Sequence, residues 1–131
     1  MLAKLSCIAI LLMVGLGAGA VWAQDDAIKR TILQKTEVPG TPYVTVLGTA
    51  EIKAGATVGR HSHPGTESGY VVEGGGELLV QGQPPRHLQP GDSFLHPTGV
   101  PHSFRNGDKP TKIVSSFVVD KDKPLASPVP E

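Results

Sequence analysis

The chain has 131 residues, in which 12 lysines and arginines balance 12 aspartates and glutamates, so its formal net charge is zero. This length suits one globular domain. The balanced charge also lacks the basic surface that attracts a nucleic-acid backbone, so we expect no nucleic-acid partner. The 16 glycines and 12 prolines fall in short groups between apolar runs, which is typical of turns between strands.

An apolar segment near the N-terminus predicts export. Lys4 precedes a largely apolar run over residues 5–16, and the small residues Val21 and Ala23 stand at the third and first positions before Gln24. The run is shorter than the roughly 20 residues of a membrane span. We therefore interpret residues 1–23 as a secretory signal peptide and expect a secreted or periplasmic protein with no membrane span after cleavage. An uncleaved membrane anchor and a lipoprotein site at Cys7 are the alternatives.

Cleavage after Ala23 would leave a chain without cysteine, because Cys7 is the only one. Disulfides, thiolate metal sites and a cysteine nucleophile are therefore excluded from residues 24–131. The stability of the fold must come from a hydrophobic core, with a metal or a partner subunit as possible additions.

The rest of the chain predicts an all-β domain with extended ends. Residues 24–42 are expected to be an N-terminal arm or strand, because 28–34 mixes β-branched with polar residues and 38–42 is rich in turn formers. Eight strands are then predicted, at 43–52, 57–63, 67–73, 77–81, 86–88, 93–96, 102–106 and 111–119. This spacing is typical of a sandwich or barrel over residues 43–119. The Pro-rich tail, residues 120–131, is expected to be extended and partly disordered.

Histidines and a carboxylate gather at two places along this pattern. His61 and His63 project to the same side of one strand, the turn at 64–65 can return Glu67 toward them, and His102 begins a later strand. Three imidazoles and one carboxylate suit iron, manganese, nickel, copper or zinc, and argue against calcium or magnesium. Taken singly, each of these residues could equally be an ordinary surface or turn residue.

The spacing of these residues forms two motifs. The first is Gly-x5-His-x-His-x3-Glu-x6-Gly, formed by Gly55, His61, His63, Glu67 and Gly74; the second is Gly-x5-Pro-x-Gly-x2-His-x3-Asn, formed by Gly91, Pro97, Gly99, His102 and Asn106. Through both motifs the chain resembles the small single-domain members of the cupin superfamily. The resemblance implies a jelly-roll β-barrel in which His61, His63, Glu67 and His102 bind one divalent transition metal. It also implies a homodimer, which would cover the exposed edge strands.

Other residues near the motifs have weaker assignments. His96 shares a face with Phe94 and could point into the barrel as an acid/base group or as a partner of a metal ligand, or it could be a structural or surface histidine. Phe104 is expected to line the pocket, and Asn106 to cap a strand end or turn. Tyr70 should face away from the metal, and His87 should lie on the surface.

The resemblance leaves the activity open. A metal with four protein ligands has coordination positions left that water, oxygen or a substrate can occupy. We expect a metal-dependent enzyme that acts on a small organic molecule, of the dioxygenase, decarboxylase, isomerase or lyase type. A non-catalytic metal- or ligand-binding cupin is the alternative, and a structural interaction module without metal is a third interpretation, since fold alone does not choose among them.

Overall fold

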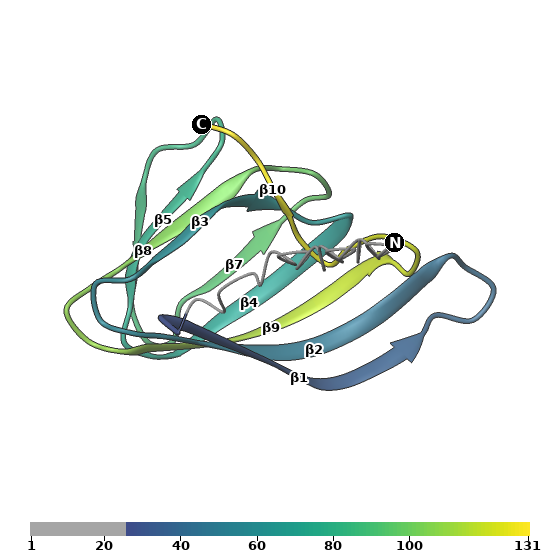
Figure 1. Cartoon of the computed structure of the whole chain (residues 1–131), viewed down its shortest axis with the longest axis horizontal. Helices are drawn as coiled ribbons and strands as arrows, with labels where there is room; N and C mark the ends of the chain where they lie inside the picture. The colour runs from purple at the N-terminus through teal and green to yellow at the C-terminus, as the bar shows by residue number, and fades with distance from the viewer. Residues whose placement is uncertain (1–25) are drawn as a thin grey trace, which may run out of the picture.

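The computed structural model describes residues 26–131, so the predicted signal peptide at residues 1–23 lies outside the described residues. The described chain folds into ten strands that follow one another around two facing layers (Figure 1). They are β1 (Ile28–Glu37), β2 (Tyr43–Ile52), β3 (Thr57–Ser62), β4 (Gly65–Glu73), β5 (Gly76–Val80), β6 (Arg86–Leu88), β7 (Ser93–His96), β8 (His102–Asn106), β9 (Thr111–Asp120) and β10 (Ser127–Pro128). The eight strands predicted from residue 43 onward are confirmed.

The strands form two antiparallel five-stranded sheets. The first has the order β1-β2-β9-β4-β7 and the second the order β10-β3-β8-β5-β6. Strands that are consecutive in the sequence often lie in different sheets, which makes the fold the predicted all-β jelly roll. The family motifs therefore come from both layers, because β4 and β7 belong to the first sheet and β3 and β8 to the second.

Alternating side chains explain why these sequences pack as strands. In β4 the odd-numbered positions from Gly65 to Val71 are buried and the even-numbered positions are exposed, and β9 buries its odd-numbered positions from Thr111 to Val119. This period of two turns one face of each strand toward the space between the sheets. Two apolar clusters fill that space, one around Val71 and Phe104 and the other around Val46 and Phe117.

Both ends of the described chain pair with the body of the fold. Strand β1 pairs along its length with β2, from Ile28 opposite Ile52 to Glu37 opposite Val44. The C-terminal segment, which we expected to be extended and partly disordered, crosses back over the second sheet, where β10 pairs with β3. Arg60 holds this segment, since its guanidinium donates hydrogen bonds to the main-chain oxygen of Pro130 and to the side chain of Gln81.

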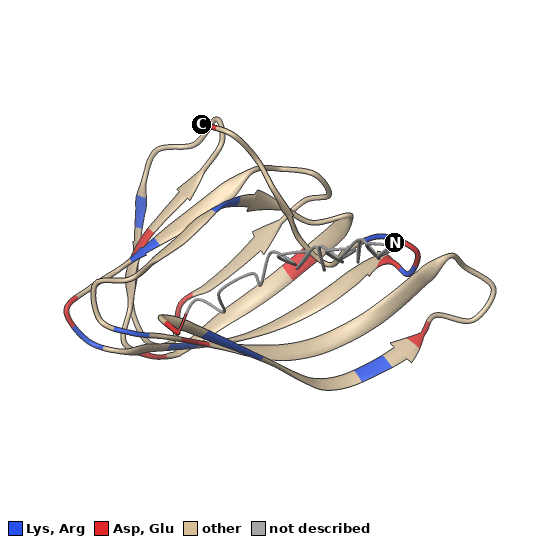
Figure 2. Ribbon diagram, in the orientation of Figure 1, with Lys and Arg blue, Asp and Glu red and all other residues tan. Residues whose placement is uncertain are grey.

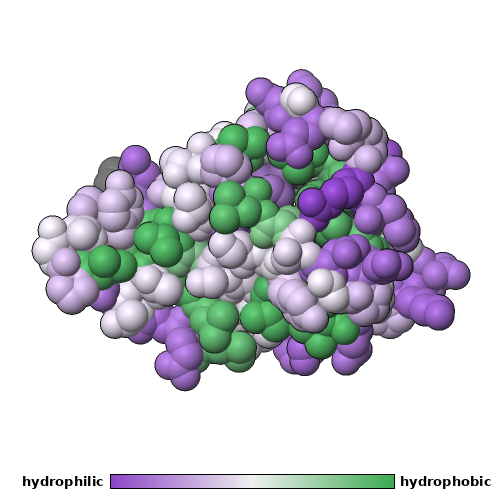
Figure 3. Space-filling model, turned by 180° about the vertical axis from the view of Figure 1, so that it is seen from behind, coloured by the Kyte–Doolittle hydropathy of each residue, from purple (hydrophilic) through white to green (hydrophobic). Residues whose placement is uncertain are grey.

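The surface carries charges of both signs and scattered apolar residues. Lysines and arginines and acidic residues are scattered over the loops and strands (Figure 2). Apolar side chains reach the surface in several separate patches on the face shown in Figure 3. Residues 26–131 include no helix of the length and hydropathy that a membrane crossing requires.

Candidate metal centre

The four residues predicted as metal ligands come together between the two sheets. His61 on β3 lies directly opposite His102 on β8, and Glu67 on β4 lies opposite Phe117 on β9. One ring nitrogen from each of His61, His63 and His102 lies within 4.8 Å of the other two. Glu67 Oε2 lies 3.1 Å from His63 Nε2 and 3.4 Å from His102 Nε2. The four side chains thus belong to two overlapping groups, His61 with His63 and His102, and Glu67 with His96 and His102.

Turns bring the two halves of the cluster into contact. The loop between β7 and β8 contains Gly99, whose φ of 75° is strained for residues with a Cβ. The amide of Gly99 donates a hydrogen bond of 3.0 Å to the main-chain oxygen of His63. The loop that precedes His102 is therefore attached to the segment that carries His63. Asn106, at the other end of β8, acts as the predicted cap, because its Nδ2 contacts the main-chain oxygens of Ile52, Lys53 and Lys109.

Main-chain oxygens fix the orientation of the three histidine rings. The Nδ1 atoms of His61, His63 and His102 lie 2.7, 2.7 and 2.9 Å from the carbonyl oxygens of Gly59, Leu125 and Val100. A carbonyl oxygen only accepts, so each Nδ1 must carry the proton of the bond. In the neutral ring, Nε2 then has a free lone pair. Such second contacts are typical of histidines that bind metals.

The buried polar atoms of the cluster fit a bound cation. The Nε2 atoms of His63, His96 and His102 are buried and make no hydrogen bond within the described residues. The Nε2 lone pairs of His63 and His102 face Glu67 Oε2 at 3.1 and 3.4 Å. Lone pairs that face one another repel, so this arrangement requires a metal ion or a proton between them. Nitrogen and carboxylate donors without a thiolate suit the divalent transition metals named above. The residues present therefore fit a metal ion.

His96 joins the cluster from β7 as a fourth histidine. It lies opposite Glu67 across the strand pair, and its Nδ1 is 3.1 Å from Glu67 Oε2. Its ring stacks on His102 and on Phe94, with centroids 3.7 and 4.8 Å apart. Only 3% of His96 is exposed, so the surface alternative considered for this residue is wrong.

The cluster shifts the pKa values of its members in different directions. Burial lowers the pKa of His61 to about 4 and also lowers the pKa of His96. Burial opposes the charged form of His63, but the Glu67 carboxylate and the Leu125 carbonyl outweigh it and raise the pKa of His63. For Glu67, burial favours the neutral acid, yet contacts with His102, His63 and His96 hold its pKa well below the usual range. Glu67 is therefore a carboxylate at neutral pH.

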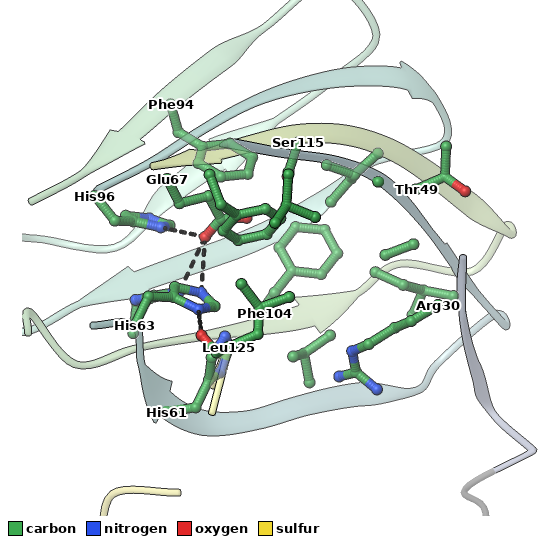
Figure 4. A pocket seen from close by; sticks show the side chains of 18 of the residues that line it. Arg30, Thr49, His61, His63, Glu67, Phe94, His96, Phe104, Ser115 and Leu125 are labelled. Atoms are coloured by element: carbon green, nitrogen blue, oxygen red, sulfur yellow. Dashed lines mark hydrogen bonds and ion pairs between the residues drawn. The ribbon is translucent and has the colours of Figure 1, made fainter. Parts of the chain in front are cut away.

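An apolar cavity of about 370 Å³ opens beside the cluster (Figure 4). It is bordered by both core clusters, and Phe104 lines it as predicted. The volume lies at the low end of the range for small-molecule sites. Tyr70 faces away from it and is 51% exposed, and His87 is also exposed. Sequence reasoning missed Arg30 and Leu125, which line the cavity from the two ends of the chain.

A family model described as "Cupin domain" matches residues 48–117, which is slightly more than half of the chain. The chain belongs to the cupin family. This match includes His61, His63, Glu67, His96 and His102, and it leaves out β1 and β10.

Two curated proteins illustrate what this cupin is similar to. The dimethylsulfoniopropionate lyase DddQ of Ruegeria pomeroyi is 46% identical over 50 residues, which are 38% of this chain and 25% of the lyase. The HTH-type transcriptional regulator PuuR of Escherichia coli is 39% identical over 88 residues, which cover 63% of this chain and 47% of the regulator. The chain thus spans between a quarter and a half of these curated relatives.

Solved structures extend the similarity beyond the matched segments. The crystal structure of DddQ from Ruegeria pomeroyi superposes with a TM-score of 0.68 and 27% identity, over 88% of this chain and 57% of the lyase chain. The structure of KdgF from Halomonas sp. gives a TM-score of 0.61 and 26% identity, over 75% of this chain and 85% of KdgF. The cupin barrel is therefore shared with a lyase that acts on a small molecule.

Proposed function

We propose that this cupin is an exported metalloenzyme of the lyase type that acts on a small organic molecule. The observation that carries the proposal is the convergence of three histidines with Glu67 beside an apolar cavity. His61, His63, Glu67 and His102 would hold one divalent transition metal. Such an ion acts as a Lewis acid toward an oxygen of the substrate. The similarity to DddQ supports a lyase over the other reaction types of the fold.

His96 is the residue of this chain best placed to move a proton. Its Nδ1 donates to the Glu67 carboxylate, so the lone pair of the neutral ring is on Nε2. Burial lowers the pKa of His96, which keeps the ring neutral near pH 7. Nε2 has no hydrogen-bond partner among the described residues, and His96 lines the cavity. We therefore assign His96 Nε2 as the acceptor of a proton from the substrate.

Metal analysis tests the proposal directly. Protein purified without an affinity tag or a chelator should contain one equivalent of a transition metal, and the double variant His61→Ala, His102→Ala should contain none. His87→Ala is the matched control, because His87 is exposed on β6 and lies outside the cluster. A double variant that retains one equivalent of metal with an unchanged melting curve would contradict the site.

A substrate screen in air then separates the reaction types. Cleavage of a substrate without oxygen uptake is the result expected of a lyase. Oxygen uptake by an iron-containing protein would replace the lyase assignment with a dioxygenase. The similarity to a transcriptional regulator favours one alternative, a non-catalytic cupin that binds a metal or a small ligand. Stoichiometric metal and ligand binding without turnover would support that alternative.

Export and assembly form part of the proposal. Mass spectrometry of the exported protein should find an N-terminus at Gln24, whereas an intact Met1 on a protein that stays in the cytoplasm would contradict export.

We also propose a homodimer that covers the outer face of the first sheet, where Tyr70, Val72, Leu95 and Val118 are exposed. Light scattering should give twice the mass of the processed chain, and a monomer at micromolar concentration would count against the dimer.

A further inference from the structure

Arg30 is the residue of β1 that brings a positive charge to the cavity. It lies opposite Ala50, and its neighbours on the same face, Ile28 and Ile32, lie opposite Ile52 and Gly48. Residues directly opposite each other in a sheet point to the same side, and Ile52 is buried between the sheets. The Arg30 side chain therefore points to the inner side of the first sheet. Ala50 and Gly48 are small, so they leave space above the sheet for the guanidinium.

The charges that line the cavity are few and unevenly distributed. Arg30 is the only lysine or arginine among the cavity-lining residues of the described chain, and Glu67 is the only carboxylate. The Glu67 carboxylate is already in contact with His63, His96 and His102. Arg30 lies on the side of the cavity away from His96 and Glu67 (Figure 4).

Arg30 has no acidic partner among the described residues, unlike the adjacent Lys29. Lys29, the preceding residue on β1, pairs with Glu51 at 3.6 Å, and Arg105 pairs with Glu77 at 3.2 Å. No described carboxylate lies within ion-pair distance of Arg30. A guanidinium offers a planar pair of N–H donors that matches a carboxylate. Arg30 is an exposed residue that also lines the cavity, so its charge is available to an anion that enters the cavity from solvent.

We propose that Arg30 binds the carboxylate of the substrate, so that the cavity selects small organic acids with an apolar body. The inference rests on the proposed function, in which the other end of the substrate faces the histidine and glutamate cluster. Phe94, Phe104 and Phe117 line the same cavity and provide the apolar contact. One guanidinium balances a single carboxylate, and the cavity of about 370 Å³ limits the size of the body.

Arg30 lies outside the two cupin motifs and outside the region that the family model matches. The cupin match begins at residue 48, whereas Arg30 lies on the edge strand β1 that precedes it. Pairing with β2 alone sets its location, because β1 has no second neighbour in the sheet. A strand outside the matched region would thus determine substrate class, while the matched strands carry the metal cluster.

Matched probes test whether Arg30 recognises the negative charge. Benzoate and benzamide have nearly the same shape, but only benzoate carries a carboxylate. Calorimetric titration of the wild-type protein should show that benzoate binds more tightly than benzamide. Arg30→Gln should weaken benzoate binding about tenfold or more, the size expected for a hydrogen bond to a charged group. Arg30→Lys should recover only part of it, since an ammonium cannot form the paired contact.

Lys29→Gln is the control, because it removes the same charge from the adjacent residue. Lys29 does not line the cavity, so benzoate affinity should stay unchanged. The titrations are made with metal-free and with metal-loaded protein, and metal content is measured in every variant. Equal affinity of the wild-type protein for benzoate and benzamide, or an unchanged benzoate affinity in Arg30→Gln, would overturn the role of Arg30. Loss of the proposed metal site would instead appear as absent metal in the wild-type protein, while the Arg30 dependence could still be measured.

Discussion

The ring of His63 is held by the main chain of Leu125, with Nδ1 of the histidine 2.7 Å from the carbonyl oxygen. The two residues are 62 positions apart in the chain. Leu125 also packs its side chain against the cluster formed by Val44, Val46, Phe117 and Val119. The C-terminal segment therefore has two separate effects, one on the orientation of a candidate metal ligand and one on the core.

Truncation after Pro124 should weaken metal binding. The change removes the Leu125 carbonyl, so His63 loses the acceptor that fixes its ring, and it also removes β10, which pairs with β3 beside His61. Loss of such a contact typically lowers metal affinity about 10- to 100-fold. Competition titration against a chromophoric chelator measures this change.

Leu125→Ala is the control for the truncation, because it keeps the main-chain oxygen and removes the packing. We expect nearly wild-type metal affinity and a loss of about 1 kcal/mol in the free energy of unfolding, since the side chain is only half-buried. Wild-type metal affinity in the truncated chain would show that the Leu125 carbonyl does not position His63.

His96→Ala should distinguish a positioning or proton-transfer role from direct ligation. The variant removes the hydrogen bond to Glu67 Oε2 and the lone pair at Nε2, but it leaves the four proposed ligands in place. We expect one equivalent of metal with weaker affinity, together with loss of turnover on any substrate that the wild-type enzyme converts. Complete loss of metal would instead make His96 a ligand, in agreement with its place in a second cluster with Glu67 and His102.

The strands and the proposed ligands could be predicted because both depend on short-range patterns. The strands were predicted from β-rich runs between turn residues, and each motif has a fixed number of residues between turn glycines and histidines. A period of two and a fixed spacing determine which side chains share a face. Alternation placed His61 and His63 on one face, and the resemblance to the cupin motifs joined Glu67 and His102 to them.

The contacts that surround those ligands depend on pairing between distant strands. Glu67 lies opposite His96 because β4 pairs with β7, and no local pattern sets that register. Leu125 acts through a carbonyl oxygen, which every residue possesses, so its sequence gives no signal. Arg30 lies on a strand whose exposed residues do not alternate clearly between polar and apolar, so its inner face could not be recognised. The alternation of β1 with respect to the core becomes visible only through its register with β2.

Gly65→Ala should disturb the cluster through the backbone. A Cβ at Gly65 would clash with the main-chain oxygen of Val118 on the neighbouring strand β9, and only a backbone movement can relieve the clash. The start of β4 must then move away from β9, and Glu67 is two residues further along β4. We expect a loss of about 1–3 kcal/mol in the free energy of unfolding together with weaker metal binding.

Gly59→Ala is the matched control for Gly65→Ala. A Cβ at Gly59 meets no atom within 4 Å, and the carbonyl that accepts from His61 Nδ1 is kept. Chemical denaturation should therefore give nearly wild-type stability for this variant. Equal stability of the two variants would contradict the close approach of β4 and β9 at Gly65.

The stabilisation that metal gives to the fold should decrease as the pH falls, and His63 should determine where the decrease begins. A proton and a metal compete for Nε2 of each histidine. Burial lowers the pKa of His61 to about 4, so this ring stays neutral over most of the accessible range. The pKa of His63 is raised, because the Glu67 carboxylate and the Leu125 carbonyl outweigh its burial. Protonation of His63 therefore starts above the ordinary histidine value of about 6.5.

A fall in pH changes the contribution of His63 to stability in opposite directions in the metal-free and the metal-loaded protein. Without metal, a raised pKa of His63 in the folded state adds stability below about pH 6.5, and this contribution is lost as the pH rises through the pKa of the folded state. With metal, binding adds stability by mass action only while His63 is free of its proton. The difference in Tm between the two forms should thus be largest near about pH 8 and should shrink on acidification from above about pH 6.5. Thermal denaturation of both forms across this range measures it, and a constant difference down to about pH 5 would exclude His63 as a ligand that competes with a proton.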